Sequence, residues 1–123
     1  MNNSPNEKLE ILMPVHNEGK SLEETIIKTY EVIKSKINFS FIICEDGSND
    51  DTVEILNRLK LKYPIILLTY PFKKGYSNAV IDGIKHATAD YLLVMDSDGQ
   101  CDPKEIFKFW DNRKKADLIN GNR

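Results

Sequence analysis

Two aspartates that directly follow an apolar segment show the clearest chemistry in this sequence. The segment is 91–95, Tyr-Leu-Leu-Val-Met, and Asp96-Ser97-Asp98-Gly99-Gln100 comes directly after it. The carboxylates of Asp96 and Asp98 and the amide of Gln100 are the kind of oxygen ligands that Mg²⁺ or Mn²⁺ binds. Open α/β sheets bind ligands at the carboxyl ends of their strands. We therefore predict a divalent-cation site where this segment ends.

The elements that must position these side chains alternate between apolar runs and amphipathic segments. Strands are predicted at 9–13, 39–44, 65–70 and 91–95, and a fifth begins at 117–120. Helices are predicted from a capping box at 21–24, at 52–62, at 76–87 and from Pro103 onward. This order, with continuously apolar strands, predicts an α/β fold: a Rossmann-like, mostly parallel sheet with helices on both faces, in three layers.

Length and composition limit the class of protein. The chain has 123 residues, of which 41% are hydrophobic and 29% charged, as expected for one globular domain at 9–123 after a polar tail at 1–8. The net charge of −2 argues against nucleic-acid binding. No apolar run approaches the ~20 residues that cross a bilayer. Cys44 and Cys101 form no metal-type cluster, so we expect a cytoplasmic protein. Because the chain stops three residues after the start of a fifth strand at 117–120, we also expect it to be incomplete at its C-terminus.

Polar loops follow the first four predicted strands, and a parallel sheet would place all four on one rim. They are Pro14-Val15-His16-Asn17-Glu18, Glu45-Asp46-Gly47-Ser48, Lys73-Lys74-Gly75 and the aspartate pair. Such a rim offers carboxylates for a base, a ribose and a metal, and lysines for phosphate. Each motif also has a simpler interpretation, because Asp is common in turns, adjacent lysines are often solvated, and one histidine is weak evidence for a ligand.

In this order, the motifs resemble the family 2 inverting glycosyltransferases of GT-A fold. The resemblance covers about residues 9–123 and includes the series Gly75, Ala79, Gly83 and Ala87. That series by itself indicates close packing of a helix on the sheet. Gln100 followed by Pro103 is most similar to the dolichyl- or polyprenyl-phosphate sugar transferases of that family.

The resemblance implies a nucleotide pocket formed by the first three loops. Pro14, His16 and Glu18 would line the pocket, and Asp46 would accept a hydrogen bond from the base. Lys74 would help to hold the diphosphate. His16 stands where an aromatic residue is usual, so the resemblance leaves the identity of the base open.

The resemblance also implies a catalytic metal centre. Asp96 would lie near the ribose and the metal, and Asp98 with Gln100 would coordinate Mg²⁺ or Mn²⁺. Arg123 belongs to a segment similar to a Gly-Ser-Arg segment of the family, and it would reach a phosphate of the donor or the acceptor. Asp96 and Asp98 are the predicted catalytic residues, and no rim residue is a convincing general base.

The implied reaction transfers a sugar from a UDP- or GDP-sugar, with inversion, to a polyprenyl phosphate or a saccharide in cell-wall or glycan biosynthesis. For this chain alone we expect donor and metal binding with little turnover, and any membrane association through sequence beyond Arg123. The sequence does not name the sugar or the acceptor.

Other classes share parts of the pattern. The run that ends in Asp96-Ser97-Asp98-Gly99 also resembles the first motif of haloacid-dehalogenase-type phosphatases, in which Asp96 would be the nucleophile. A nucleotidyltransferase would need a glycine-rich basic loop after Met13, which is missing. A calcium loop would need Glu where Phe107 stands. A non-catalytic nucleotide-binding fragment remains an alternative.

Overall fold

A computed structural model describes residues 7–96 and 102–115, in which strands and helices alternate as predicted. The strands are β1 (Leu9–Val15), β2 (Phe39–Asp46), β3 (Ile65–Tyr70) and β4 (Tyr91–Val94). The helices are α1 (Gly19–Ile33), α2 (Thr52–Leu59), α3 (Tyr76–His86) and α4 (Glu105–Asp111), followed by a 3₁₀ turn at Arg113–Lys115. The fifth strand predicted at 117–120 lies outside the described residues.

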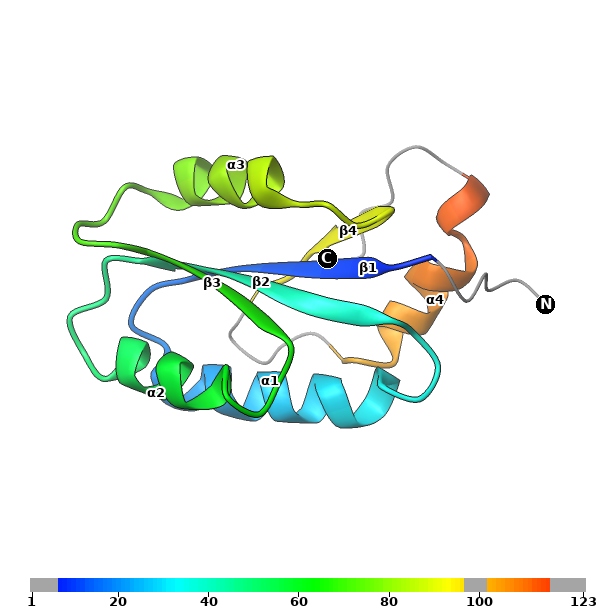
Figure 1. Cartoon of the computed structure of the whole chain (residues 1–123), viewed down its shortest axis with the longest axis horizontal. Coiled ribbons are helices and arrows are strands. Elements are labelled where there is room, and N and C mark those ends of the chain that lie inside the picture. Colours follow the sequence, from blue (N-terminus) through cyan, green and yellow to red (C-terminus); the bar gives the residue numbers. More distant parts are fainter. Residues whose placement is uncertain (1–6, 97–101, 116–123) are drawn as a thin grey trace.

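The strands form a parallel sheet in the order β3-β2-β1-β4 (Figure 1). The chain moves outward from β1 through β2 to β3. Helix α3 then forms the connection that returns the chain across the sheet and places β4 on the other side of β1. Leu9 is therefore paired with both Phe39 and Tyr91. The reversal between β1 and β4 creates the switch point at which open α/β sheets bind ligands.

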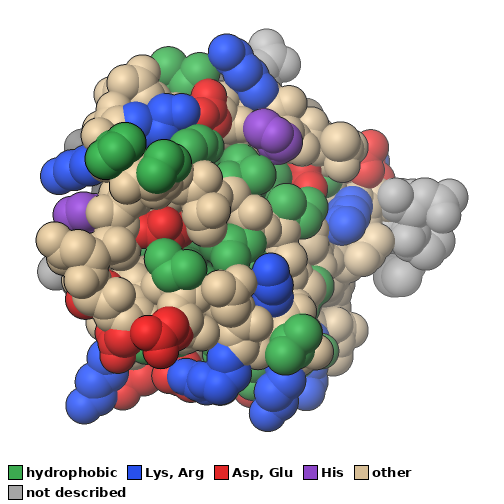
Figure 2. Space-filling view, turned by 60° about the vertical axis from the view of Figure 1, so that its left-hand side comes forward, with side chains coloured by type: hydrophobic (Ala, Val, Ile, Leu, Met, Phe, Trp, Pro, Cys, Tyr) green, Lys and Arg blue, Asp and Glu red, His purple; other side chains and the backbone are tan. Residues whose placement is uncertain are grey.

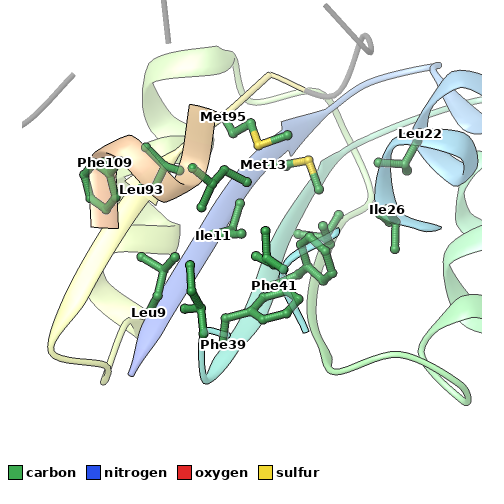
Figure 3. Packing of buried hydrophobic residues seen from close by; sticks show 14 of the residues in the cluster. Leu9, Ile11, Met13, Leu22, Ile26, Phe39, Phe41, Leu93, Met95 and Phe109 are labelled. Carbon is green, nitrogen blue, oxygen red and sulfur yellow. The ribbon is translucent and has the colours of Figure 1, made fainter. Parts of the chain in front are cut away.

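Helices cover both faces of the sheet, which confirms the predicted three layers. In Figure 1, α3 lies on one side of the sheet, and α1 and α2 lie on the other. The larger core cluster joins Ile11, Met13 and Phe41 of the sheet to Leu22 of α1 and Phe109 of α4 (Figure 3). Burial of these apolar side chains supplies most of the driving force for folding.

Helix α3 packs unusually close to the sheet, as the series of small residues predicts. A Cβ added to Gly83 would lie 2.4 Å from Leu12 Cδ1 and 2.7 Å from Cys44 Sγ, and Ala79 is fully buried. Burial also raises the pKa of the Cys44 thiol to about 11, so this cysteine stays protonated and serves in packing.

The predicted capping box at 21–24 is wrong. Helix α1 begins at Gly19, and Ser21 lies inside it, where its hydroxyl donates to the Glu18 carbonyl (3.3 Å). The start is set by tertiary contacts, because the Glu18 N–H donates to Thr52 Oγ1 (3.1 Å) and a Cβ on Gly19 would lie 2.7 Å from Ile55 Cδ1. Contact with α2 therefore overrides the local capping signal.

Two other element ends differ from the prediction. Strand β1 continues through Pro14 to Val15. The nitrogen of Pro14 points to the β4 side of β1 but lies past the last residue of β4, so its missing N–H costs no hydrogen bond between strands. Helix α4 begins at Glu105, and Asp102 accepts a hydrogen bond from the Lys104 N–H (3.0 Å) in the turn that precedes it.

Candidate functional site

A pocket of about 340 Å³ lies at the carboxyl ends of β1, β2 and β4, at the switch point of the sheet. Figure 2, in which this edge comes forward, shows hydrophobic side chains surrounded by acidic, basic and histidine side chains. The lining residues are Pro14, Val15, His16, Glu18, Asp46, Lys73, Tyr76 and Asp96. A concave site with convergent polar groups at this place is the usual form of a ligand site in such a fold.

The structure brings most of the described candidates together. The predicted residues Pro14, His16, Glu18, Asp46 and Asp96 lie at or just after the ends of three strands, and all line this pocket. The predicted site residues Asp98, Gln100 and Arg123 lie outside the described residues. Within residues 7–96 and 102–115, no group of three or more His, Cys, Asp or Glu side chains could hold a metal ion.

Asp46, the last residue of β2, is almost completely buried and fixes the loop that follows β3. Its Oδ1 accepts a hydrogen bond from the Lys74 N–H (2.6 Å), and its Oδ2 accepts one from the Gly75 N–H (3.0 Å). Gly47 has a φ of 65°, and a Cβ at this position would lie 2.4 Å from the Lys73 nitrogen. The ends of β2 and β3 are thus locked together.

His16 connects the ends of β1 and β2. Its Nδ1 lies 2.7 Å from the carbonyl oxygen of Asp46, so this nitrogen carries the proton and donates it. Its Nε2 lies 3.3 Å from the side-chain nitrogen of Asn17, which donates to it. In this hydrogen-bond network Nδ1 is the donor and Nε2 the acceptor.

The loops after β1 and β2 are tied to one another by further hydrogen bonds. The Asn17 N–H donates to Ser48 Oγ (2.9 Å), and Asn17 Oδ1 accepts from the Asn49 N–H (2.9 Å). Asn17 has a φ of 52°, a conformation that Asn tolerates better than most residues. Hydrogen bonds from Thr52 hold the pKa of the Asp50 carboxyl below its usual value.

The two adjacent lysines have different surroundings. The Lys74 ammonium forms an ion pair with Asp82 of α3 and lies 4.0 Å from the centre of the Tyr70 ring. Hydrogen bonds from Lys74 and Tyr70 lower the pKa of the Asp82 carboxyl. Lys73 lines the pocket, and its ammonium has no ion-pair partner in the described part of the chain. The residue predicted to meet the diphosphate, Lys74, is therefore directed into a contact with α3.

The pocket also contains Tyr76, which the sequence did not single out, and Val15 and Lys73, which the sequence placed in the rim loops without a role of their own. Partial burial, together with the negative charge of Asp96, raises the pKa of the Tyr76 hydroxyl. Tyr76 is therefore a neighbour of Asp96, although twenty residues separate them in sequence. Its position as the first residue of α3, directly after a rim loop, is the signal that could have found it.

The family model of glycosyl transferase family 2 matches residues 10–123. The chain belongs to this family. The dolichol-phosphate mannosyltransferase of Pyrococcus furiosus is 33% identical over 117 residues, which are 94% of this chain and 33% of that protein. The poly-beta-1,6-N-acetyl-D-glucosamine synthase of Staphylococcus aureus is 29% identical over 119 residues, which are 94% of this chain and 28% of that protein. The chain thus spans about a third of the length of these relatives.

Solved structures of glycosyltransferases have the same fold. The mannosyltransferase PcManGT from Pyrobaculum calidifontis, in complex with GDP-Man and Mn2+, matches with a TM-score of 0.64 and 22% identity, over 73% of this chain and 27% of that chain. Staphylococcus aureus TarS matches with a TM-score of 0.66 and 20% identity, over 87% of this chain and 20% of that chain. These similarities confirm the predicted GT-A fold.

The family assignment also decides between the glycosyltransferase and the phosphatase interpretations of the sequence. This is a family of glycosyltransferases, so the resemblance that the motifs indicated is confirmed. A phosphatase that uses Asp96 as its nucleophile finds no support, because Asp96 follows the fourth strand of a domain that matches another family. None of the described helices is long and apolar enough to cross a membrane.

Proposed function

We propose that the pocket binds a UDP- or GDP-sugar, and that the protein transfers the sugar with inversion to a polyprenyl phosphate or a saccharide. One observation carries this proposal. In a family 2 glycosyltransferase domain, the buried Asp46 at the end of β2 and Asp96 after β4 line one pocket, on either side of β1. This spacing suits an extended donor, with its base near Asp46 and its diphosphate near Asp96.

The oxygen ligands that these residues offer suit Mg²⁺ or Mn²⁺. Asp96 presents a half-buried carboxylate to the pocket, and Asp98 and Gln100 follow it with further hard oxygen ligands. We propose that these residues hold the cation. When bound, the cation acts as a Lewis acid that stabilises the negative charge of the departing diphosphate.

The chain's own residues orient the nucleotide. Pro14 and Val15 form the part of the wall between the two acidic positions, and Glu18 lines the pocket at the start of α1. The hydrogen bond to the Asp46 carbonyl keeps the His16 ring fixed, so this ring is a preorganised contact for the nucleoside. Preorganised polar groups of this kind lose little freedom when the donor binds.

The two proposed acceptors differ in whether a proton must be removed from the attacking oxygen. A hydroxyl acceptor needs a general base to take its proton, whereas a polyprenyl phosphate is already ionised. His16 and the pocket carboxylates are assigned to donor or metal contacts, so a base for a hydroxyl acceptor would come from outside the described pocket, and the proposal keeps both acceptors. We propose a role in glycan or cell-wall biosynthesis at the cytoplasmic face of a membrane.

Titration calorimetry with UDP- and GDP-sugars tests the donor site. We expect binding that depends on Mn²⁺ and that Asp98→Ala weakens at least about tenfold, since each metal–ligand contact contributes a few kcal/mol. Asp111→Ala is the matched control, because this exposed aspartate ends α4 and does not line the pocket. Donor binding that needs neither Mn²⁺ nor Asp98 would overturn the assignment.

A transfer assay with the full-length gene product tests turnover. We expect sugar to appear on a polyprenyl phosphate or a saccharide, with the anomeric configuration inverted. Donor binding without transfer to either acceptor would instead support a non-catalytic nucleotide-binding domain.

A further inference from the structure

The way in which Asp46 is bonded points to a role beyond contact with the donor. We propose that Asp46 is a positioning residue that holds the loop 72–75, so that the Lys73 ammonium reaches an oxygen of the donor nucleotide. This inference rests on the proposed function, and it assigns the basic contact to Lys73 in place of Lys74.

The carboxylate of Asp46 is committed to the main chain of this loop. Each of its two oxygens accepts a hydrogen bond from one of two successive N–H groups, those of Lys74 (2.6 Å) and Gly75 (3.0 Å). Asp46 is only 3% exposed, so water cannot easily replace either bond. Loss of one oxygen would release the segment that directly follows Lys73.

The packing of Gly47 fixes the same loop from a second direction. A Cβ at this position would lie 2.4 Å from the Lys73 nitrogen and 2.5 Å from the Phe72 carbonyl carbon. These are main-chain atoms, so a side chain at position 47 must displace the loop. The main chain at residues 72–75 is therefore fixed by two independent contacts with the end of β2.

The two lysine side chains of the loop point to different places, because only one of them has a partner on α3. Lys74 is directed toward α3 by Asp82 and Tyr70, whereas Lys73 lines the pocket. Glu18, Asp46 and Asp96 are the acidic residues of the lining, and Lys73 is its basic residue. A nucleotide brings phosphate oxygens and base carbonyls into this acidic pocket, and an ammonium that pairs with no described carboxylate is suited to meet one of them.

A double-mutant cycle tests the proposal by calorimetry with UDP or GDP in the presence of Mg²⁺. In Asp46→Asn, an amide N–H₂ replaces one acceptor oxygen and faces a backbone donor. We expect Asp46→Asn and Lys73→Met each to weaken binding about tenfold, and the double variant to bind no more weakly than the weaker single variant. Independent effects, about a hundredfold in the double variant, would overturn the positioning role.

Two further variants separate positioning from loss of folding. Gly47→Ala displaces the loop but retains the Asp46 carboxylate, and we expect it to weaken binding as Asp46→Asn does. Glu10→Ala is the matched control, because Glu10 Oε1 accepts hydrogen bonds from the Thr88 (2.8 Å) and Ala89 (3.0 Å) N–H groups at the far end of α3. We expect Glu10→Ala to lose stability and to keep the wild-type affinity.

The choice of nucleotide identifies the oxygen that Lys73 meets. If it is a phosphate oxygen of the diphosphate, Lys73→Met weakens UDP binding and leaves uridine binding unchanged. If it is a base carbonyl, the variant weakens both, and for the O4 carbonyl it also reduces the preference for uridine over cytidine, which carries an amino group at C4. Wild-type binding that Lys73→Met leaves unchanged for every nucleotide would overturn this inference alone. No nucleotide binding by the wild type would overturn the proposed function as well.

Discussion

Helix α3 is held at its two ends by the same device, a buried carboxylate on a strand that accepts hydrogen bonds from two successive N–H groups. At the carboxyl ends of the strands, where the pocket lies, Asp46 of β2 holds the amides of Lys74 and Gly75. At the opposite end of the strands, Glu10 of β1 holds the amides of residues 88 and 89. We call these the Asp46 clamp and the Glu10 clamp.

The two clamps differ in how the oxygens are used and in what lies beside them. Asp46 uses one oxygen for each N–H, and it lines the pocket. Glu10 uses Oε1 for both N–H groups, and its buried Oε2 has no hydrogen-bond partner in the described part of the chain. A buried, well-bonded carboxylate therefore does not by itself indicate function. Its place at the carboxyl ends of the strands is the reason that we propose a function for the Asp46 clamp and not for the Glu10 clamp.

We expect the largest loss of stability when α3 is forced away from the sheet between the two clamps. Gly83→Leu would place side-chain atoms where Leu12 and Cys44 already lie, so we expect a loss of about 3 kcal/mol or more in the free energy of unfolding. Urea denaturation measures this loss. Ile84→Leu, at the neighbouring exposed position, is the control. Equal stability of the two variants would show that α3 does not depend on close packing.

Truncation of either carboxylate tests whether the clamps share a structural role and differ in function. We expect Asp46→Ala and Glu10→Ala each to lose about 1–3 kcal/mol of stability, because two backbone N–H groups lose their acceptor. Donor affinity should fall in Asp46→Ala alone. Denaturation and calorimetry on the same samples measure both quantities. An equal loss of donor affinity in Glu10→Ala would remove the functional distinction.

Much of the pocket could be predicted because its signals are local. Apolar runs indicate the strands, and polar residues directly follow them. The rule that parallel strands end at one rim was then sufficient to group Pro14, His16, Glu18, Asp46 and Asp96, which all line the pocket. The family resemblance carried by the same motifs is also confirmed.

The parts that sequence reasoning missed depend on contacts between distant segments. Which lysine faces the pocket is decided by Asp82 and Tyr70, which direct Lys74 toward α3. The start of α1 is decided by the contacts of Glu18 and Gly19 with α2, so the capping box at 21–24 is wrong. No local pattern around Asp46 indicates that its carboxylate holds a loop 28 residues farther along the chain.

Replacement of each carboxylate by its amide tests how the two clamps use their oxygens, with a smaller expected loss of stability. In Asp46→Asn one N–H loses its acceptor, and we expect a loss of about 1 kcal/mol. In Glu10→Gln the retained Oε1 still accepts both bonds and a buried charge is removed, so we expect a change within about 0.5 kcal/mol. Urea midpoints measure the difference. A larger loss in Glu10→Gln would contradict the assigned use of the two oxygens.

The smallest expected effect concerns the pH dependence of stability near the Asp46 clamp. Hydrogen bonds from Lys74 and Tyr70 lower the pKa of Asp82 from its usual 3.8, so the folded state favours the ionised carboxylate. This stabilisation is present above about pH 4 and is lost as the pH falls through the lowered pKa. We expect Asp82→Asn to lose less stability than the wild type between about pH 6 and about pH 3. Equal losses in denaturation curves would contradict this role of Asp82.

Amide chemical-shift mapping by NMR during titration with UDP or GDP and Mg²⁺ tests the central claim, that the pocket at the carboxyl ends of β1, β2 and β4 is the donor site. We predict saturable shifts at His16, Lys74 and Gly75, and none at Thr88 and Ala89 in the Glu10 clamp. Shifts confined to the Glu10 clamp or to α4, or no saturable shift at all, would contradict the account.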